Sequence, residues 1–210
     1  MSLIEDLKWR YATKKFDPTK RVDSVQLEKI KEAIRLAPSS LGLQPFQVLQ
    51  ITNPDLRAQL REVSWGQSAI TDADILLVFC NMTEVSDNYL EYMADLMQKE
   101  RHGSDESKAG YLNFVKGYMH SLTSEEIKVW SAEECYIAAT IAMVACAELQ
   151  LDSCPIGGFD PKEYDRLLNL SAQKLNATLV LPIGYRAADD EYQLAAKVRK
   201  PMDELFRSIK

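Results

Sequence analysis

Residues 136–149 read YIAATIAMVACAEL, a stretch that is rich in alanine and apolar on nearly every face of a helix. A helix that is apolar all round is normally buried in the centre of a protein. We therefore predict a central helix over about 131–149 that is packed on all sides. So much apolar helix surface in a chain of 210 residues would also be well covered by a partner subunit.

Three apolar stretches outside this helix are typical of β-strands. They are FQVLQI at 46–51, ILLVFC at 75–80 and ATLVLPI at 177–183, and the second is a continuous apolar run of the kind found in buried strands. The strands are few and helices separate them, so the pattern predicts an α+β or α/β protein in which helices dominate.

Helix starts between the strands are marked by residues that cap helix N-termini. Such side chains accept hydrogen bonds from the unpaired N–H groups of the first turn. The strongest signal is Asp160-Pro161 followed by Glu163, which combines a cap, a first-turn proline and a capping-box glutamate. The other predicted helices are a short one after Ser2 and Glu5, one from Asp23 or Ser24 to Pro38, one from Asn53-Pro54 to about Val63, and charged helices over 86–129 with a capping box at Thr123 and Glu126.

Length and charge restrict the kind of protein. A chain of 210 residues fits one domain, 1–210, and a net charge of −6 argues against a nucleic-acid or membrane-surface partner. The N-terminus MSLIEDLKWR has acidic residues where a signal peptide would be apolar, and we expect no stretch that approaches a membrane span. The sequence therefore predicts a cytoplasmic protein without a membrane partner.

The four cysteines lie in apolar surroundings and include no C-x-x-C pair. This pattern predicts buried free thiols in a reducing compartment rather than disulfides or a zinc site. The chain has only two histidines, His102 and His120, both in polar helical sequence. We therefore expect neither a metal site nor a histidine-based catalytic triad.

Two basic segments stand out because the chain is acidic overall. In KWRYATKKFD, at 8–17, an extended backbone would place Arg10, Ala12 and Lys14 on one side. In KVRKP, at 197–201, an extended backbone would place Lys197 and Arg199 on one face. Each segment is suited to holding a small anion. The alternatives are a solvated basic turn for the first and an ordinary charged helix end for the second.

The stretch CPIGGFDPKEY, at 154–164, puts two glycines directly before a helix start. Gly157 and Gly158 would let backbone N–H groups approach a ligand without obstruction by side chains, although a purely structural turn would look similar. The sequence contains neither G-x-G-x-x-G nor G-x-x-x-x-G-K-[ST], so it predicts neither a Rossmann nor a P-loop nucleotide site.

Taken together, these segments resemble the nitroreductase family of FMN-dependent oxidoreductases. The resemblance runs from about residue 3 to residue 201 and rests on five motifs in the family's order and spacing. The motifs are RYATKKFD at 10–17, APSSLGLQPF at 37–46, CPIGGFD at 154–160, LVLPIGY at 179–185 and KVRKP at 197–201.

The resemblance implies an α+β fold with a central, mainly antiparallel sheet flanked by helices. It also implies a homodimer built on long central helices, with one FMN in each of two clefts at the subunit interface and NADH or NADPH as co-substrate. Arg10, Lys197 and Arg199 would grip the FMN phosphate, with Tyr11 and Ala12 beside them.

Further contacts to the flavin are implied by the same resemblance. Lys14 would lie near the N1 and C2 carbonyl edge, where it would tune the electronics of the flavin, and the Gly158 N–H would point at flavin N5. The remaining contacts would be made from the partner subunit by Pro38, Ser39, Ser40 and Gly42, and on one ring face by Pro155, Ile156, Gly157 and Gly158.

The chain departs from the family's pattern in SWGQSAITDAD, at 64–74. Many relatives carry an asparagine, then a lysine or glutamine three residues on, and both reach the flavin's pyrimidine edge. Gly66 and Ala69 stand at the equivalent positions here, which leaves Gln67 as the expected replacement donor. Some relatives also carry glutamate at the position of Gly157.

The resemblance implies a reaction in two alternating halves. A hydride passes from NADH or NADPH to flavin N5, the nicotinamide leaves, and a quinone, nitroaromatic or flavin then accepts the electrons. The cofactor supplies the chemistry, and we expect no side-chain acid or base. The alternatives are a specialised enzyme of the same fold, such as an enal or enone reductase or a dehydrogenase, and a non-catalytic FMN carrier or sensor.

Overall fold

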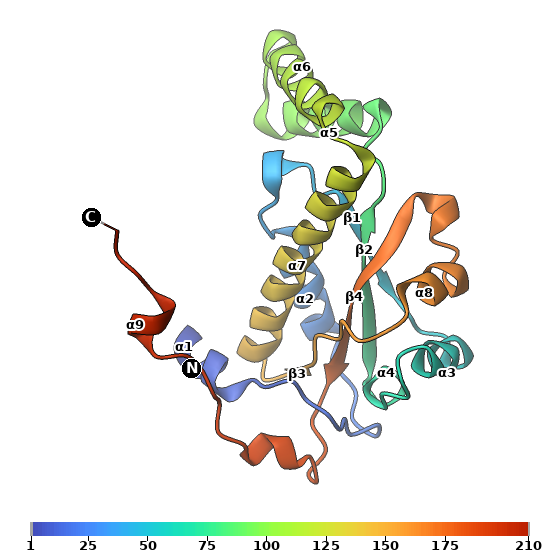
Figure 1. Ribbon diagram of the computed structural model, residues 1–210, viewed down its shortest axis with the longest axis vertical. Helices are drawn as coiled ribbons and strands as arrows, with labels where there is room; N and C mark the ends of the chain where they lie inside the picture. Colours follow the sequence, from blue (N-terminus) through green and yellow to red (C-terminus); the bar gives the residue numbers. More distant parts are fainter. Residues whose placement is uncertain (1, 210) are drawn as a thin grey trace.

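The centre of the protein is a four-stranded sheet, shown in Figure 1 by a computed structural model that describes residues 2–209. The strand order is β1-β2-β4-β3, and all three neighbouring pairs are antiparallel. The α+β prediction with an antiparallel sheet is therefore confirmed. The strands are β1 Phe46–Gln50, β2 Ile75–Met82, β3 Asp152–Ser153 and β4 Leu175–Gly184.

The helices begin close to the predicted caps. Ser2 and Thr123 form complete capping boxes, whereas Asp160 caps its helix alone, because the Glu163 carboxylate pairs with Arg166 instead. The α-helices are α1 Leu3–Trp9, α2 Ser24–Arg35, α3 Pro54–Glu62, α4 Ala69–Asp72, α5 Asp87–Arg101, α6 Asp105–Ser121, α7 Ser124–Glu148, α8 Pro161–Leu167 and α9 Met202–Leu205, and the 3-10 turns are Ser40–Gly42, Ser171–Gln173 and Glu191–Leu194.

Helix α7 corrects two expectations. It runs unbroken from Ser124, so the predicted central helix and the capped segment before it form one helix, since no proline or glycine separates them. It is also not packed on all sides: Cys135, Ala138 and Ala142 are buried, but the Tyr136 side of the helix faces outward, with Tyr136 itself 50% exposed.

Length and composition alone would let α7 cross a membrane, contrary to the expectation that no stretch approaches a span. Many core helices of soluble proteins share these properties. In this protein one side of α7 packs on the sheet, where its buried alanines and cysteines contact β2 and β4.

The sheet is covered by helices on both faces because strand β2 is apolar on both. Its odd-numbered residues from Ile75 to Phe79 pack against α2 and α7, and its even-numbered residues from Leu76 to Cys80 pack against α3, α4 and α8. This alternation is the two-residue period of a β-strand, and burial on both faces explains the continuous apolar run in the sequence. All four cysteines are buried and free, as predicted.

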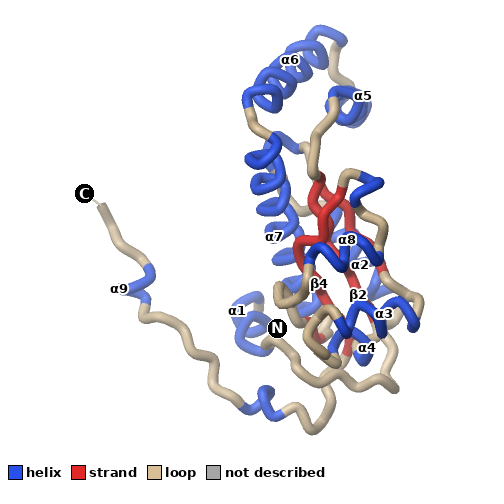
Figure 2. Tube along the Cα trace, turned by 45° about the vertical axis from the view of Figure 1, so that its right-hand side comes forward, coloured by secondary structure: helices blue, strands red, loops and turns tan. Residues whose placement is uncertain are grey.

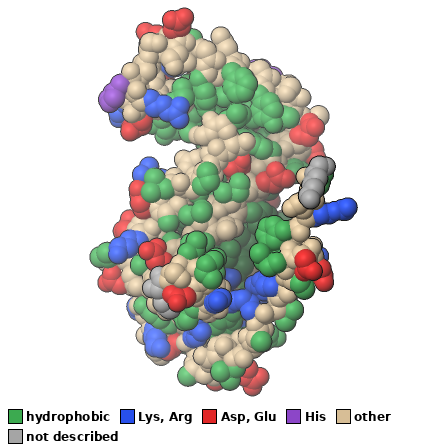
Figure 3. Space-filling model, turned by 90° about the vertical axis from the view of Figure 1, so that its left-hand side faces the viewer, with side chains coloured by type: hydrophobic (Ala, Val, Ile, Leu, Met, Phe, Trp, Pro, Cys, Tyr) green, Lys and Arg blue, Asp and Glu red, His purple; other side chains and the backbone are tan. Residues whose placement is uncertain are grey.

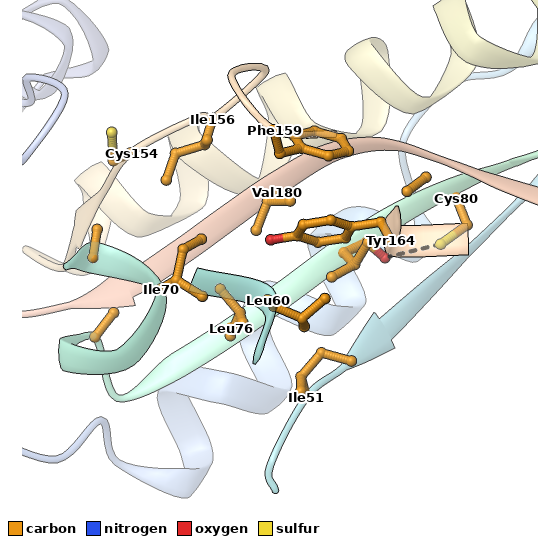
Figure 4. Close-up of a cluster of buried hydrophobic side chains, with 14 of the residues drawn as sticks. Ile51, Leu60, Ile70, Leu76, Cys80, Cys154, Ile156, Phe159, Tyr164 and Val180 are labelled. Carbon is orange, nitrogen blue, oxygen red and sulfur yellow. Dashed lines mark hydrogen bonds between the residues drawn. The ribbon is translucent and has the colours of Figure 1, made fainter. Parts of the chain in front are cut away.

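Figure 4 shows the second of these faces, where Ile156 and Phe159 flank the two glycines in the sequence. Phe159, which follows Gly158, lies against Tyr164 of α8 with ring centroids 4.5 Å apart. The Tyr164 hydroxyl oxygen lies 2.8 Å from the Ser64 Oγ, in the turn that follows α3. The residues that flank the two glycines are therefore anchored, Ile156 to strand β4 and Phe159 to helix α8.

Helices α5 and α6 form a hairpin that extends past one end of the sheet (Figure 1). They carry a separate apolar cluster with Leu90, Val115 and Met119, into which Leu43 inserts from the segment before β1. Residues 194–209, in contrast, are exposed throughout, and Figures 1 and 2 both show this C-terminal arm running away from the rest of the chain.

Candidate functional site

The two basic segments come together and line one cleft of about 470 Å³. The N-terminal segment is held in place where Ala12 forms a parallel bridge with Ser153 and Phe16 an antiparallel bridge with Arg186. On this side of the molecule, Figure 3 shows Lys and Arg side chains gathered around a hollow. The cleft is lined by Arg10, Tyr11, Ala12, Lys14, Pro155, Tyr192, Ala195, Ala196, Lys197, Val198 and Arg199.

The three predicted phosphate ligands, Arg10, Lys197 and Arg199, lie in this cleft, and none of them forms an ion pair with another residue in the described part of the chain, 2–209. The Arg10 Nη2 donates to the Tyr11 carbonyl at 3.1 Å, while its buried Nε has no partner among residues 2–209. The Lys197 Nζ donates to the carbonyl oxygens of Lys8, at 2.9 Å, and Arg10. Although Lys197 is exposed overall, partial desolvation of its ammonium group in the cleft lowers its pKa, and so do the neighbouring charges of Arg10 and Arg199. Such a cluster is suited to a small anion.

Asp190 organises the cleft, although sequence reasoning did not single it out. Its carboxylate, in a residue only 1% exposed, accepts hydrogen bonds from the Tyr11 hydroxyl at 2.9 Å and from the backbone N–H groups of Lys14, Lys15 and Tyr192. Burial alone would raise the pKa of Asp190, but these hydrogen bonds lower it overall. The only local signal is that Asp190 also caps the turn Glu191–Leu194.

Neighbouring aromatic rings hold the side of the cleft near Lys14. The Lys14 Nζ lies 5.9 Å from the centre of the Tyr192 ring, within reach of a cation–π interaction. Tyr11 stacks on the Arg186 guanidinium at 4.6 Å, and burial together with Asp190 raises the pKa of the Tyr11 hydroxyl. Tyr11 thus stays neutral and donates to Asp190 across the physiological pH range.

The segment 155–158 lies beside the cleft, but only Pro155 lines it. Ile156 is buried and bridges to Val180 of β4. A Cβ on Gly157 would meet no atom within 4 Å, whereas a Cβ on Gly158 would lie 2.5 Å from the Trp65 ring. Only glycine therefore fits at Gly158 with the indole in its present place.

Gln67 reaches the same segment in a way that the sequence did not predict. Its Nε2 donates to the carbonyl oxygens of Gly158, at 2.7 Å, and Ser64, at 3.0 Å. In this arrangement its amide orders the glycine segment. A contact between Gln67 and the flavin edge stays a prediction.

The remaining predicted residues, Pro38, Ser39, Ser40 and Gly42, do not line this cleft. They belong to a loop between α2 and β1 and are exposed or half-buried. The resemblance assigns them to the flavin of a partner subunit, so their separation from the cleft of their own chain is compatible with that prediction without testing it.

Comparison with known proteins places these features in one family. The sequence profile of the nitroreductase family matches residues 7–185. YfkO of Bacillus subtilis, provisionally named an NAD(P)H nitroreductase, is 32% identical over 218 aligned positions that cover 99% of this chain and 97% of the relative. An oxygen-insensitive NAD(P)H nitroreductase of Salmonella typhimurium is 26% identical, with both chains fully covered.

A solved structure shows the same fold. It is that of a provisionally assigned nitroreductase from Exiguobacterium sibiricum in complex with FMN, which superimposes with a TM-score of 0.87 at 18% identity and covers 100% of this chain and 98% of that one. The fold, the profile match and the curated relatives agree, and the chain belongs to the nitroreductase family.

Proposed function

We propose that this protein is an FMN-dependent NAD(P)H oxidoreductase that passes electrons to a quinone, nitroaromatic or flavin acceptor. The observation that carries the proposal is the convergence of Arg10, Lys197 and Arg199 on one cleft from opposite ends of the chain. The family match and the FMN complex of a structural neighbour support the same cofactor.

The residues of the cleft fit a flavin mononucleotide. The buried Arg10 Nε has no hydrogen-bond partner among residues 2–209. Partial desolvation and repulsion from Arg10 and Arg199 lower the pKa of Lys197, and a bound phosphate dianion would offset that repulsion. Charge-assisted hydrogen bonds of this kind contribute about 1.5 to 3 kcal/mol each. The cleft therefore accounts for the phosphate end of FMN.

The other groups of this chain would hold the ring system. When bound, FMN supplies two-electron redox chemistry between the nicotinamide and the acceptor. Lys14, positioned through its N–H by Asp190, would place a positive charge at the N1 and C2 carbonyl edge. The Gly158 N–H would face N5. The carbonyl oxygen of the same residue is held by the Gln67 side-chain amide.

We further propose that the protein works as a homodimer. The outward side of α7 exposes Val129, Tyr136 and Ile137, which are large apolar residues on the longest helix. The C-terminal arm also exposes large apolar side chains, which a second subunit would cover; these are Leu194, Val198, Met202, Leu205, Phe206 and Ile209. A location in the cytoplasm stays a prediction.

Purification tests cofactor and assembly together. We expect a yellow dimer by light scattering, and heat should release FMN rather than FAD, because the cleft has cations for one phosphate group and the sequence has no dinucleotide motif. Release of FAD, or a colourless monomer that does not bind added FMN, would refute the proposal. Rapid NADH or NADPH oxidation in the presence of a quinone would distinguish an enzyme from an FMN carrier.

A further inference from the structure

The loop formed by residues 38–44 has a strained backbone. Leu41, Gly42 and Gln44 have φ values of 58°, 69° and 43°, and only glycine adopts this left-handed region without a steric cost. A bulky residue such as Leu41 is uncommon there. Conformations of this kind persist where the surrounding structure fixes them, and they concentrate at functional sites.

Three side chains from three different helices hold this loop. The Ser40 N–H donates to the Glu134 Oε1 of α7 at 3.0 Å. The Tyr111 hydroxyl of α6 donates to the Leu41 carbonyl at 2.9 Å. The Tyr89 hydroxyl of α5 donates to the carbonyl oxygens of Leu43 and Gln44, at 2.7 and 2.9 Å.

These hydrogen bonds hold the loop from the side of helices α5, α6 and α7, and other residues of the loop are exposed. Glu134 is only 4% exposed, and its Oε2 is buried without a partner among residues 2–209. A buried carboxyl oxygen without a hydrogen-bond partner costs stability, whereas the other oxygen, Oε1, binds the loop through the Ser40 N–H. Burial raises the pKa of Tyr89 to about 12, so its hydroxyl remains a donor. Pro38, Ser40 and Gly42 meanwhile expose their outer surfaces.

We propose that Glu134, Tyr111 and Tyr89 are positioning residues that hold the 38–44 loop in the shape in which it meets the FMN of the partner subunit. The inference rests on the proposed function, because it needs the FMN and the homodimer proposed there, and on the flavin contact that the family resemblance implies for Pro38, Ser39, Ser40 and Gly42. It also assigns a task to the α5–α6 hairpin, which supplies two of the three side chains although it lies beyond the end of the sheet.

The test measures FMN affinity of the apo homodimer by fluorescence titration, together with its melting temperature. Tyr111→Phe removes one hydroxyl, and Tyr118→Phe is the matched control on the same helix, since Tyr118 is 43% exposed and its hydroxyl has no hydrogen bond within residues 2–209. We expect Tyr111→Phe to weaken FMN binding by about 3- to 10-fold and Tyr118→Phe to stay within about 2-fold.

Glu134 gives a second comparison. Glu134→Gln keeps an oxygen that accepts from the Ser40 N–H, whereas Glu134→Leu removes it at similar volume. FMN affinity should stay close to wild type in Glu134→Gln and fall by about 3- to 10-fold in Glu134→Leu. Neither variant carries a charge at this position, so the difference between Glu134→Gln and Glu134→Leu reports the hydrogen bond to the Ser40 N–H and not the charge.

A double-mutant cycle distinguishes positioning from general structural support. Leu41→Asn places at the strained position a residue that tolerates the left-handed region. If Tyr111 acts by holding Leu41 there, the effect of Tyr111→Phe on FMN affinity should shrink to less than about 2-fold in the Leu41→Asn background. An undiminished effect in that background would contradict the proposal.

The outcomes separate this inference from the proposed function. Wild-type protein that binds FMN, with Tyr111→Phe and Glu134→Leu binding it equally well, would overturn the inference alone. The inference would also fail if these variants lowered the melting temperature and left FMN affinity unchanged. Wild-type protein that binds no FMN would refute the proposed function, and the inference with it.

Discussion

The neighbouring glycines Gly157 and Gly158 allow a sharp test of the structure, because they differ in surroundings and not in chemistry. An alanine Cβ at Gly158 would lie 2.5 Å from the Trp65 Cζ3, whereas one at Gly157 would meet nothing within 4 Å. Carbon atoms in van der Waals contact are about 3.5 to 4.0 Å apart. Gly158→Ala must therefore displace the indole by roughly 1 Å or more.

The energetic cost has an upper limit set by how much of Trp65 is in contact with protein. The residue is 77% exposed, so about a quarter of its surface is covered. A fully buried aromatic side chain covers about 150 to 250 Å², and about 25 cal/mol per Å² then gives at most roughly 1.5 kcal/mol. Gly157→Ala should be neutral or stabilising by up to about 1 kcal/mol, since alanine restricts the unfolded chain.

Calorimetry on the four variants of a cycle measures this difference. We expect Gly158→Ala to melt a few degrees below Gly157→Ala, because 1 kcal/mol corresponds to about 2 to 4 °C at this chain length. Tryptophan fluorescence of Gly158→Ala should change as well. In a Trp65→Ala background the two alanine variants should melt together. If Gly158→Ala remains the less stable there, the indole is not the cause and the reasoning fails.

Three further predictions concern the cleft. Lys14→Met should lower the flavin reduction potential by about 30 to 60 mV, or about 1.4 to 3 kcal/mol for two electrons, because it removes a charge that favours reduced flavin. An anaerobic dye titration measures the potential, with Lys15→Met as the control, because Lys15 pairs with Asp189. An equal potential in both variants would exclude Lys14 from the flavin edge. Arg199→Ala should weaken FMN binding by about 10- to 100-fold in fluorescence titrations, with Arg207→Ala as the exposed control, and unchanged affinity would make Arg199 an ordinary surface residue. The hydrogen bonds that lower the pKa of Asp190 stabilise its charged form, so Asp190→Asn should be less stable than wild type at pH 7. This difference should shrink as the pH falls below about 3.9, the pKa of an unfolded aspartate, and disappear once the pH is below the pKa of Asp190 in the folded protein. Melting temperatures of the two proteins that do not converge in acid would contradict this prediction.

Local patterns in the sequence predicted most of the fold. The continuous apolar run from Ile75 to Cys80 indicated a strand buried on both faces, and Asp160 with Pro161 marked the start of α8. These features depend on neighbours within a few residues. The extent of α7 was underestimated because a capping box at Thr123 was assigned to a separate helix, although nothing after it interrupts the helix.

The organisation of the site depends on contacts that no local pattern encodes. Asp190 binds the N–H groups of Lys14 and Lys15 across about 175 positions of sequence, and this proximity exists only in the folded chain. The same is true of Glu134 and the Ser40 N–H. The basic residues of the cleft were found because charges in an acidic protein are conspicuous, whereas the residues that position them are not.

The two sides of the anion cleft come from opposite ends of the chain, and this has a consequence for biosynthesis. Arg10 precedes all four strands in the sequence, whereas Lys197 and Arg199 follow β4. While they are still inside the ribosome, the four strands of the sheet have already been synthesised, and N-terminal parts of a chain fold first. The phosphate site therefore cannot be complete until Lys197 and Arg199 have left the ribosome, whereas every strand of the sheet is synthesised before them.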